Sequence, residues 1–141
     1  MEFRAFIIHG EPVGKARARV VRRQGAVRAY TPEKTANFET LIQVEYRQSY
    51  GALPPIEGPL RVAVAAFFRT PKAYKRPALD GMDDTEAVRC TRRPDADNVS
   101  KLCLDALNGL AWKDDAQVSD LVVRKRYSLR PRVEIRIEAA R

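Results

Sequence analysis

The sequence predicts one α+β domain spanning residues 1–141, built as a mixed β-sheet with helices packed mainly on one face. Strand and helix patterns follow one another without the strict alternation of a βαβ fold, and without internal repeats or a second composition regime. Residues 60–68 are apolar on nearly both sides, so we expect this strand to lie near the centre of the sheet. A chain of 141 residues can bury a core without disulfides or a structural metal.

Two elements are expected near the N-terminus. Residues 3–8 have the pattern of a strand, which Gly10 and Pro12 stop. Residues 15–28 carry six cations and no acid, with Gln24-Gly25 as a turn. This second segment fits either a short hairpin or a mobile loop.

A helix is expected between the basic segment and the central strand. Thr31 is a suitable N-cap and Pro32 a suitable first helical residue, and the helix pattern continues to about Tyr50, where Gly51 ends it. The apolar positions recur on one helical face: Phe38, Leu41, Ile42 and Tyr46.

After the central strand, residues 69–92 have no periodic pattern and are expected to form a long loop. Asp97-Asn98 then caps a second helix, which Asn108-Gly109 closes. Its apolar positions follow the helical template: Val99, Leu102, Cys103, Ala106 and Leu107. Residues 121–127 and 132–138 have strand patterns, and the second of these alternates as a half-exposed strand does.

The composition favours a polyanionic partner. Lys and Arg number 26 against 18 Asp and Glu, a formal net charge of +8, which is typical of nucleic-acid binding, although a generally basic protein is the alternative. No apolar run approaches the roughly 20 residues of a transmembrane helix, and no signal peptide is apparent, so we expect a cytoplasmic protein without a membrane partner. Cys90, Cys103 and His9 match no common zinc pattern and are expected to be structural or free.

Acidic residues cluster around the second predicted helix. Asp95 and Asp97 are two apart, and in an extended segment both carboxylates project to one side. Lys101 follows one helical turn later, and the loop with Asp114-Asp115 is expected to fold back on the first pair. Hard oxygen ligands with few histidines indicate Mg²⁺, with Mn²⁺ as a substitute, rather than zinc.

This set suits metal-assisted phosphodiester hydrolysis, in which Lys101 adds a fixed positive charge. A structural interpretation is also open. Asp97 then serves only as a cap, Lys101 pairs with Asp105, and Asp114-Asp115 is a polar turn. From the pattern alone, capping and turn acids are the commoner case.

The sequence resembles the RusA-type Holliday junction resolvases. The central motifs are Arg93–Lys101 (RPDADNVSK), Asp105–Gly109 (DALNG) and Trp112–Val118 (WKDDAQV). The likeness extends to Lys125-Arg126-Tyr127, and the segment Gly10–Arg19 with Tyr30-Thr31-Pro32 is similar to the opening of phage members.

The resemblance implies a Mg²⁺-dependent homodimer that nicks two opposed strands of a four-way DNA junction and needs no small-molecule cofactor. Carried over by position, the metal-site aspartates are Asp95, Asp97 and Asp115, and the catalytic lysine is Lys101. In the family's pattern Asp114 is the less important acid of the Asp114-Asp115 pair, and it is a second-tier candidate for the metal site. The likeness to phage members leads us to expect a phage or prophage origin.

The basic segment is the candidate for phosphate contact, because so many cations without acids repel one another; a solvated basic loop is the alternative. The candidate residues are Lys15, Arg17, Arg19, Arg22 and Arg23. Trp112 is expected to be a core or dimer-contact residue rather than a base-stacking one. Residues 79–90 depart from the family pattern and are expected to be a tolerated surface loop.

Two rival functions stay open at this point. One is a basic DNA-architectural protein without catalysis. The other is a metal-dependent nuclease that acts on flaps, forks or RNA, since metal-site chemistry is similar whichever polynucleotide is presented.

Overall fold

The computed structural model describes residues 2–16, 19–30, 33–74 and 83–140. The predicted cap and first residue of the N-terminal helix, Thr31 and Pro32, therefore lie outside the described residues, as does Arg17. The strands are β1 (Phe3–His9), β2 (Arg19–Arg23), β3 (Ala26–Tyr30), β4 (Leu60–Arg69), β5 (Val118–Ser128) and β6 (Arg132–Ala139). The α-helices are α1 (Glu33–Tyr50) and α2 (Ala96–Leu107), and the short 3₁₀ helices are η1 (Lys72–Tyr74), η2 (Asp84–Ala87) and η3 (Asp115–Gln117).

Four strands form the main sheet in the order β1-β6-β4-β5. β4 runs antiparallel to β6 and parallel to β5, and β1 runs antiparallel to β6. The sheet is therefore mixed, and β4 lies between two neighbours, as its apolar pattern predicted. Both predictions, the α+β class and the central strand, are confirmed.

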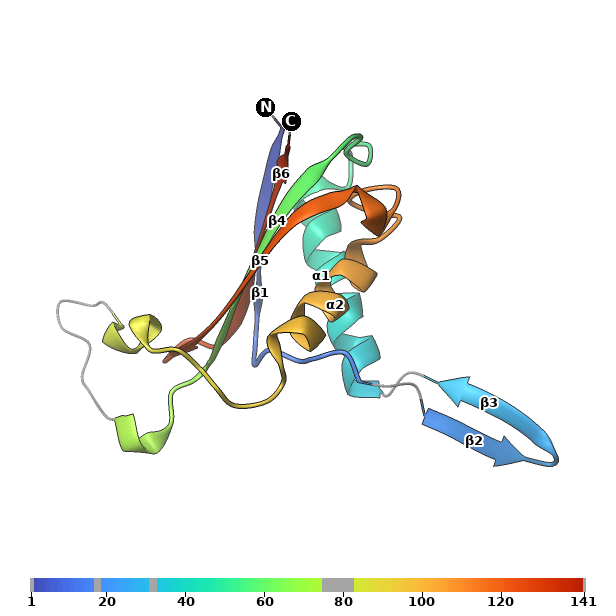
Figure 1. Ribbon diagram of the computed structural model, residues 1–141, viewed down its shortest axis with the longest axis horizontal. Coiled ribbons are helices and arrows are strands. Elements are labelled where there is room, and N and C mark those ends of the chain that lie inside the picture. Colours follow the sequence, from blue (N-terminus) through green and yellow to red (C-terminus); the bar gives the residue numbers. More distant parts are fainter. Residues whose placement is uncertain (1, 17–18, 31–32, 75–82, 141) are drawn as a thin grey trace.

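Both α-helices cover the same face of the sheet (Figure 1). α1 buries Phe38, Ile42 and Tyr46, whereas Leu41, predicted on the same face, is 47% exposed. α2 buries all five apolar positions of its template: Val99, Leu102, Cys103, Ala106 and Leu107. The match is better for α2 because its apolar residues form one continuous stripe against the sheet and α1.

The basic segment contains a hairpin that projects away from the rest of the molecule (Figure 1). β2 and β3 pair only with each other, from Arg19 opposite Tyr30 to Arg23 opposite Ala26. Gln24 and Gly25 both have positive φ, 50° and 77°, as the two central residues of a type I′ hairpin turn require. The hairpin interpretation of this segment is confirmed.

The described part of the insertion, residues 83–90, is held to the end of β5 by hydrogen bonds. Asp83 accepts from the Thr85 backbone N–H at 3.0 Å, from the Ser128 hydroxyl at 3.0 Å and from the backbone N–H of Leu129. Glu86 pairs with Arg132 at 2.8 Å. The expectation of a merely tolerated surface loop is wrong for this part, because Thr85 and Ser128 are buried with their polar groups bonded.

No helix in the described ranges is long and apolar enough to cross a membrane. Cys90 and Cys103 are both buried and free, as expected. Burial raises the pKa of Cys103 to about 12, so this thiol stays protonated and is a packing residue.

Candidate active site

Asp95 and Asp97 lie at the N-terminal end of α2, and both are exposed. The helix begins at Ala96, so Asp95 is the N-cap residue, and its side chain makes no capping hydrogen bond. The prediction that Asp97-Asn98 caps the helix is wrong by two residues. The prediction that Asp95–Asp97 is an extended segment is also wrong, because Ala96 and Asp97 already belong to the helix. Two carboxylates thus stand at the positive end of the helix dipole, and neither accepts a hydrogen bond from a residue that the structure describes.

The root of the hairpin packs against this same end of α2. The Lys15 backbone N–H donates to the Asn98 carbonyl at 2.8 Å. A Cβ on Gly14 would lie 2.5 Å from the Cβ of Pro94, so only glycine allows this close approach. The Thr35 hydroxyl, at the start of α1, donates to the Gly14 carbonyl at 3.3 Å. The base of the hairpin is therefore fixed directly beside the candidate carboxylates.

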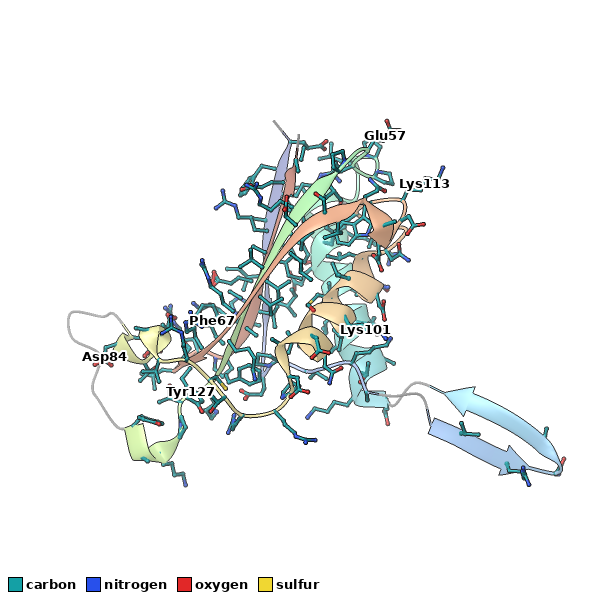
Figure 2. The ribbon with its side chains drawn as sticks, viewed as in Figure 1. Glu57, Phe67, Asp84, Lys101, Lys113 and Tyr127 are labelled. Atoms are coloured by element: carbon teal, nitrogen blue, oxygen red, sulfur yellow. The ribbon has the colours of Figure 1, made fainter. Side chains whose placement is uncertain are left out.

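Lys101 lies one turn after Asp97 on the exposed side of α2 (Figure 2). The alternative in which Lys101 pairs with Asp105 is contradicted, because Asp105 instead accepts from Lys15 at 3.2 Å. No ion pair joins Lys101 to another residue that the structure describes. Its ammonium group is available to an external anion.

Lys15, predicted to contact phosphate, is already engaged by two carboxylates. Its ammonium group lies 2.6 Å from Glu39 and 3.2 Å from Asp105. Burial lowers the pKa of Lys15, but the hydrogen bonds to Glu39 and Asp105 outweigh burial and raise it above its ordinary value. In this arrangement Lys15 ties the hairpin root to both α-helices, a role that its place in a basic segment did not indicate.

Asp115 lies beyond the other end of α2. Trp112 is completely buried, and its indole N–H donates to the Asp115 carboxylate at 2.7 Å. The Asp115 backbone N–H donates to the Asn108 side chain at 3.1 Å. Burial raises the pKa of Asp115; the bond from Trp112 opposes the rise, and repulsion by Asp105 and Asp114 adds to it. Trp112 is therefore a core residue, as expected, and it also orients Asp115.

Asp114 has the structural role that the alternative interpretation assigned to the pair. Its side chain accepts from the Ala116 backbone N–H at 3.0 Å and caps η3, and Gln117 completes a capping box. Asp115 has no such role. The two neighbouring acids thus differ in what they contact.

A single chain does not bring the three predicted metal ligands together. Asp95 and Asp115 lie at opposite ends of α2, whose 12 residues span about 18 Å at 1.5 Å per residue. Figure 2 shows the same separation: Lys113 lies near the upper end of the helix, well away from Lys101. Among the described residues, no group of three His, Cys, Asp or Glu is arranged to hold a metal ion. The predicted fold-back of the Asp114-Asp115 loop onto the first pair does not occur within one chain.

Two further residues make contacts that the sequence did not indicate. Asp105 forms an ion pair with Lys15, and its charge helps to raise the pKa of Asp115, whereas from the sequence it was considered only as a partner of Lys101. Trp112 was identified only as a packing residue, although its spacing of three from Asp115 is compatible with a side-chain contact across one turn.

Three of the five cations predicted to bind DNA lie on the hairpin: Arg19, Arg22 and Arg23 are in β2, and Arg22 is exposed. A second group of cations, which was not predicted to bind DNA, lines the C-terminal half of β5 and the segment beside it. It consists of Arg124, Lys125, Arg126, Arg89 and Arg92.

Residues 9–138 match the family of the endodeoxyribonuclease RusA, which covers nearly the whole chain. The chain is also similar to YqaN, an uncharacterized protein of Bacillus subtilis strain 168. The two are 37% identical over 138 residues, which cover 94% of this chain and 93% of YqaN.

Proposed function

Because the chain belongs to the RusA endodeoxyribonuclease family, we propose that it resolves four-way DNA junctions by nicking two opposed strands. The observation that carries this proposal is the N-terminal end of α2, where Asp95 and Asp97 have no capping role and Lys101 lies on the same exposed side. Neither carboxylate makes a side-chain hydrogen bond to a described residue, and Lys101 pairs with none of the described acids, so all three groups are available to a cation and a phosphate.

We propose Mg²⁺ as the cofactor, with Mn²⁺ as a substitute. One chain alone does not fit this ion, because its described carboxylates are divided between the two ends of α2. Two copies related by a two-fold axis fit better: with their α2 helices antiparallel, Asp95 and Asp97 of one copy approach Asp115 of the other. Such a set offers the oxygen ligands that Mg²⁺ takes, and the chemistry supplied there is activation of water and charge stabilisation. The proposed enzyme is therefore a homodimer with composite sites.

The residues of this chain then have separate roles. Trp112 holds the Asp115 carboxylate in one orientation through the 2.7 Å hydrogen bond, so this ligand is placed before the partner arrives. Lys101 puts a positive charge near the phosphate oxygens, where negative charge grows during hydrolysis. Lys15 fixes the base of the hairpin through Glu39 and Asp105. The DNA backbone is held by the cations of the hairpin segment: Arg17, Arg19, Arg22 and Arg23.

Co-expression of two variants that we expect to be inactive on their own, Asp97→Asn and Asp115→Asn, tests the composite site. The Asp115→Asn chain retains Asp97, and the Asp97→Asn chain retains Asp115. In a mixed dimer these two intact residues meet in one of the two sites, so cleavage of a synthetic junction should return. Co-expression of Asp95→Asn with Asp97→Asn is the matched control. Asp95 and Asp97 of a given site come from the same chain, so each site of this mixed dimer lacks one of the two residues and stays inactive. Equal activity from both mixtures, or none from either, would contradict the composite site.

The rival functions are separated by substrate. A junction, a fork, a flap, a duplex and an RNA are incubated side by side with and without Mg²⁺, and the products are mapped. We expect Mg²⁺-dependent paired nicks on the junction. Binding without nicks indicates an architectural protein, and preferred cleavage of forks, flaps or RNA indicates a different nuclease. We place the activity in the cytoplasm, consistent with two free thiols, and phage or prophage origin stays a prediction.

A further inference from the structure

Strand β5 has one edge that is open over its N-terminal half. It is the last strand in the sheet order and pairs with β4 along its inner edge. On its outer edge, the Cys90 N–H donates to the Lys125 carbonyl at 3.1 Å and the Tyr127 N–H donates to the Val88 carbonyl at 3.2 Å. The segment 88–90 therefore covers only the C-terminal half of this edge. No described residue forms a backbone hydrogen bond to the outer edge of residues 119–123.

The open half presents backbone groups and apolar side chains together. Main-chain groups of alternate residues point to the same edge of a strand, and those of Lys125 and Tyr127 point outward. Leu121 and Val123 have the same parity and therefore also point their N–H and C=O groups outward. The side chains of Leu121 and Val122 are each 42% exposed. A long apolar edge of this kind is a template for a further strand and is normally covered.

Negative and positive side chains lie at opposite ends of β5. Acids lie at or just before its start: Asp114, Asp115 and Asp120. Cations lie in and beside its C-terminal half: Arg124, Lys125, Arg126, Arg89 and Arg92. A second copy that pairs antiparallel sets each acidic end against the other's basic end. The edge is therefore complementary to itself.

The same pairing brings the divided carboxylates toward one another. The Lys125 ammonium donates to the Arg92 carbonyl at 2.5 Å, so the chain leaves the β5 edge there and reaches Asp95 three residues later. Asp115 precedes the first residue of β5 by three positions. When the start of one β5 lies beside the end of the other, Asp115 of one copy approaches the segment that leads to Asp95 of its partner.

We propose that the open edge of β5, residues 119–123, is the dimer interface, and that a second copy of this chain pairs with it antiparallel about a two-fold axis at Leu121. The proposal rests on the proposed function, which requires a dimer, and adds to it the surface and the register. Leu121 then lies opposite its own copy, and the four-stranded sheet continues into that of the partner.

A single cysteine tests the register. In Leu121→Cys, the two Cα atoms face each other as a hydrogen-bonded antiparallel pair, about 5.5 Å apart, a separation that a disulfide can span. Under mild oxidation we expect most of this variant to become a covalent dimer on non-reducing electrophoresis. Leu129→Cys is the control, since Leu129 is 52% exposed but lies after the end of β5. The native thiols are buried and should not react. Absence of cross-linking at position 121, or equal cross-linking at both positions, overturns the proposal.

A charged variant tests the interface without oxidation. Leu121→Lys places two like charges at the axis, and sedimentation should show the dimer dissociation constant raised by about 10-fold or more. Leu129→Lys should dissociate as the wild type does. Circular dichroism of both variants establishes that the monomer is folded. Unchanged dissociation of folded Leu121→Lys overturns the proposal.

These outcomes are separate from those of the proposed function. If co-expressed Asp97→Asn and Asp115→Asn cut junctions while Leu121→Cys does not cross-link, the function stands and the dimer uses another surface. If Leu121→Cys cross-links while the wild type cuts no junction in Mg²⁺, the interface stands and the proposed function is overturned.

Discussion

Asp95 and Asp97 differ from the other acids around α2 because their carboxylates make no hydrogen bond to a described residue. Asp114 caps η3, Asp115 accepts from Trp112, and Asp105 accepts from Lys15. A carboxylate that already accepts hydrogen bonds is held in one orientation, whereas an unbonded one can turn toward an incoming cation. The C-terminal end of α2 thus holds a carboxylate in a fixed orientation, and the N-terminal end carries two carboxylates that can turn.

At these positions we predict that Asp95→Asn, Asp97→Asn and Asp115→Asn each abolish junction cleavage while junction binding stays near normal. The amide keeps the shape of the side chain but removes the charge that attracts a divalent cation, and affinity for DNA rests on the distant cations of the hairpin. Cleavage and gel-shift assays measure the two effects. Asp84→Asn, an exposed acid in η2, is the control and should cut normally. Normal cutting by any of the three variants removes that residue from the site.

For Lys101 we predict a role in the reaction rather than in stability. Lys101→Ala should lower the cleavage rate by about 10²-fold or more, the usual effect of losing one electrostatic stabiliser, without changing the melting temperature. The side chain is exposed and its helix buries all its apolar positions without it. Lys113→Ala, an exposed lysine near the other end of α2, should be nearly normal in both assays. A loss of activity that follows a loss of folded protein shows a structural role instead.

At the scale of elements, the sequence was sufficient where a local pattern decides the outcome. The apolar template of α2 and the continuous apolar run of β4 predicted both elements and their places. It was insufficient where tertiary contact decides. The loop after α2 stays at that helix's C-terminal end because Trp112 is buried there and binds Asp115. No periodicity in the sequence contains that information, so the predicted fold-back was wrong.

The anchored insertion was missed for the same reason, since Ser128, which donates to Asp83, is 45 residues away in the sequence. Burial raises the pKa of Asp83, but hydrogen bonds from Thr85, Leu129 and Ser128 outweigh burial and lower the pKa below its ordinary value. A carboxyl with a lowered folded-state pKa stabilises the fold above its unfolded pKa of about 4, and this contribution is lost as the pH falls through the folded value.

We therefore predict that Asp83→Asn lowers the free energy of unfolding by about 1–3 kcal/mol at pH 7, the range for leaving buried partners unsatisfied. The difference from the wild type should shrink as the pH falls below about 4, because the wild-type carboxyl then becomes protonated as well. Urea denaturation at a series of pH values measures it. Asp84→Asn, the exposed neighbour, should match the wild type throughout. A deficit for Asp83→Asn that is the same at every pH would show that the charge is not what matters.

The hairpin is the element on which DNA affinity is predicted to depend. Arg19→Gln with Arg22→Gln should weaken junction binding and flatten its salt dependence, by about one unit of slope for each phosphate that the protein no longer neutralises. Cleavage at saturating enzyme should survive better than binding, since the carboxylates are untouched. Arg61→Gln with Arg136→Gln is a charge-matched control, because both arginines pair with acids on the sheet. If the two double variants weaken junction binding equally, the affinity depends only on the net charge of the protein and not on the hairpin.

At the scale of the whole molecule, the chain has a net charge of +8, and the root of its basic hairpin packs against the acidic N-terminal end of α2. The hairpin projects away from the rest of the molecule (Figure 1), and its root is bonded to Asn98, the residue after Asp97. A polyanion drawn to the cations is thus delivered beside the acids, whose repulsion of phosphate a divalent cation is expected to neutralise. A two-fold dimer repeats this arrangement once, and a four-way junction offers two symmetrically placed strands.

The final prediction follows from that matching symmetry. When the wild type is co-expressed with a large excess of Asp97→Asn, most wild-type chains are in mixed dimers, each with one intact site. We expect such preparations to leave junctions nicked on a single strand, whereas the wild type alone produces resolved duplexes. A junction labelled on both opposed strands measures the ratio of singly to doubly cut products. Wild type diluted to the same number of intact sites is the control. If resolved products fall only in proportion to the intact sites, without accumulation of singly nicked junctions, the two cuts do not come from one dimer.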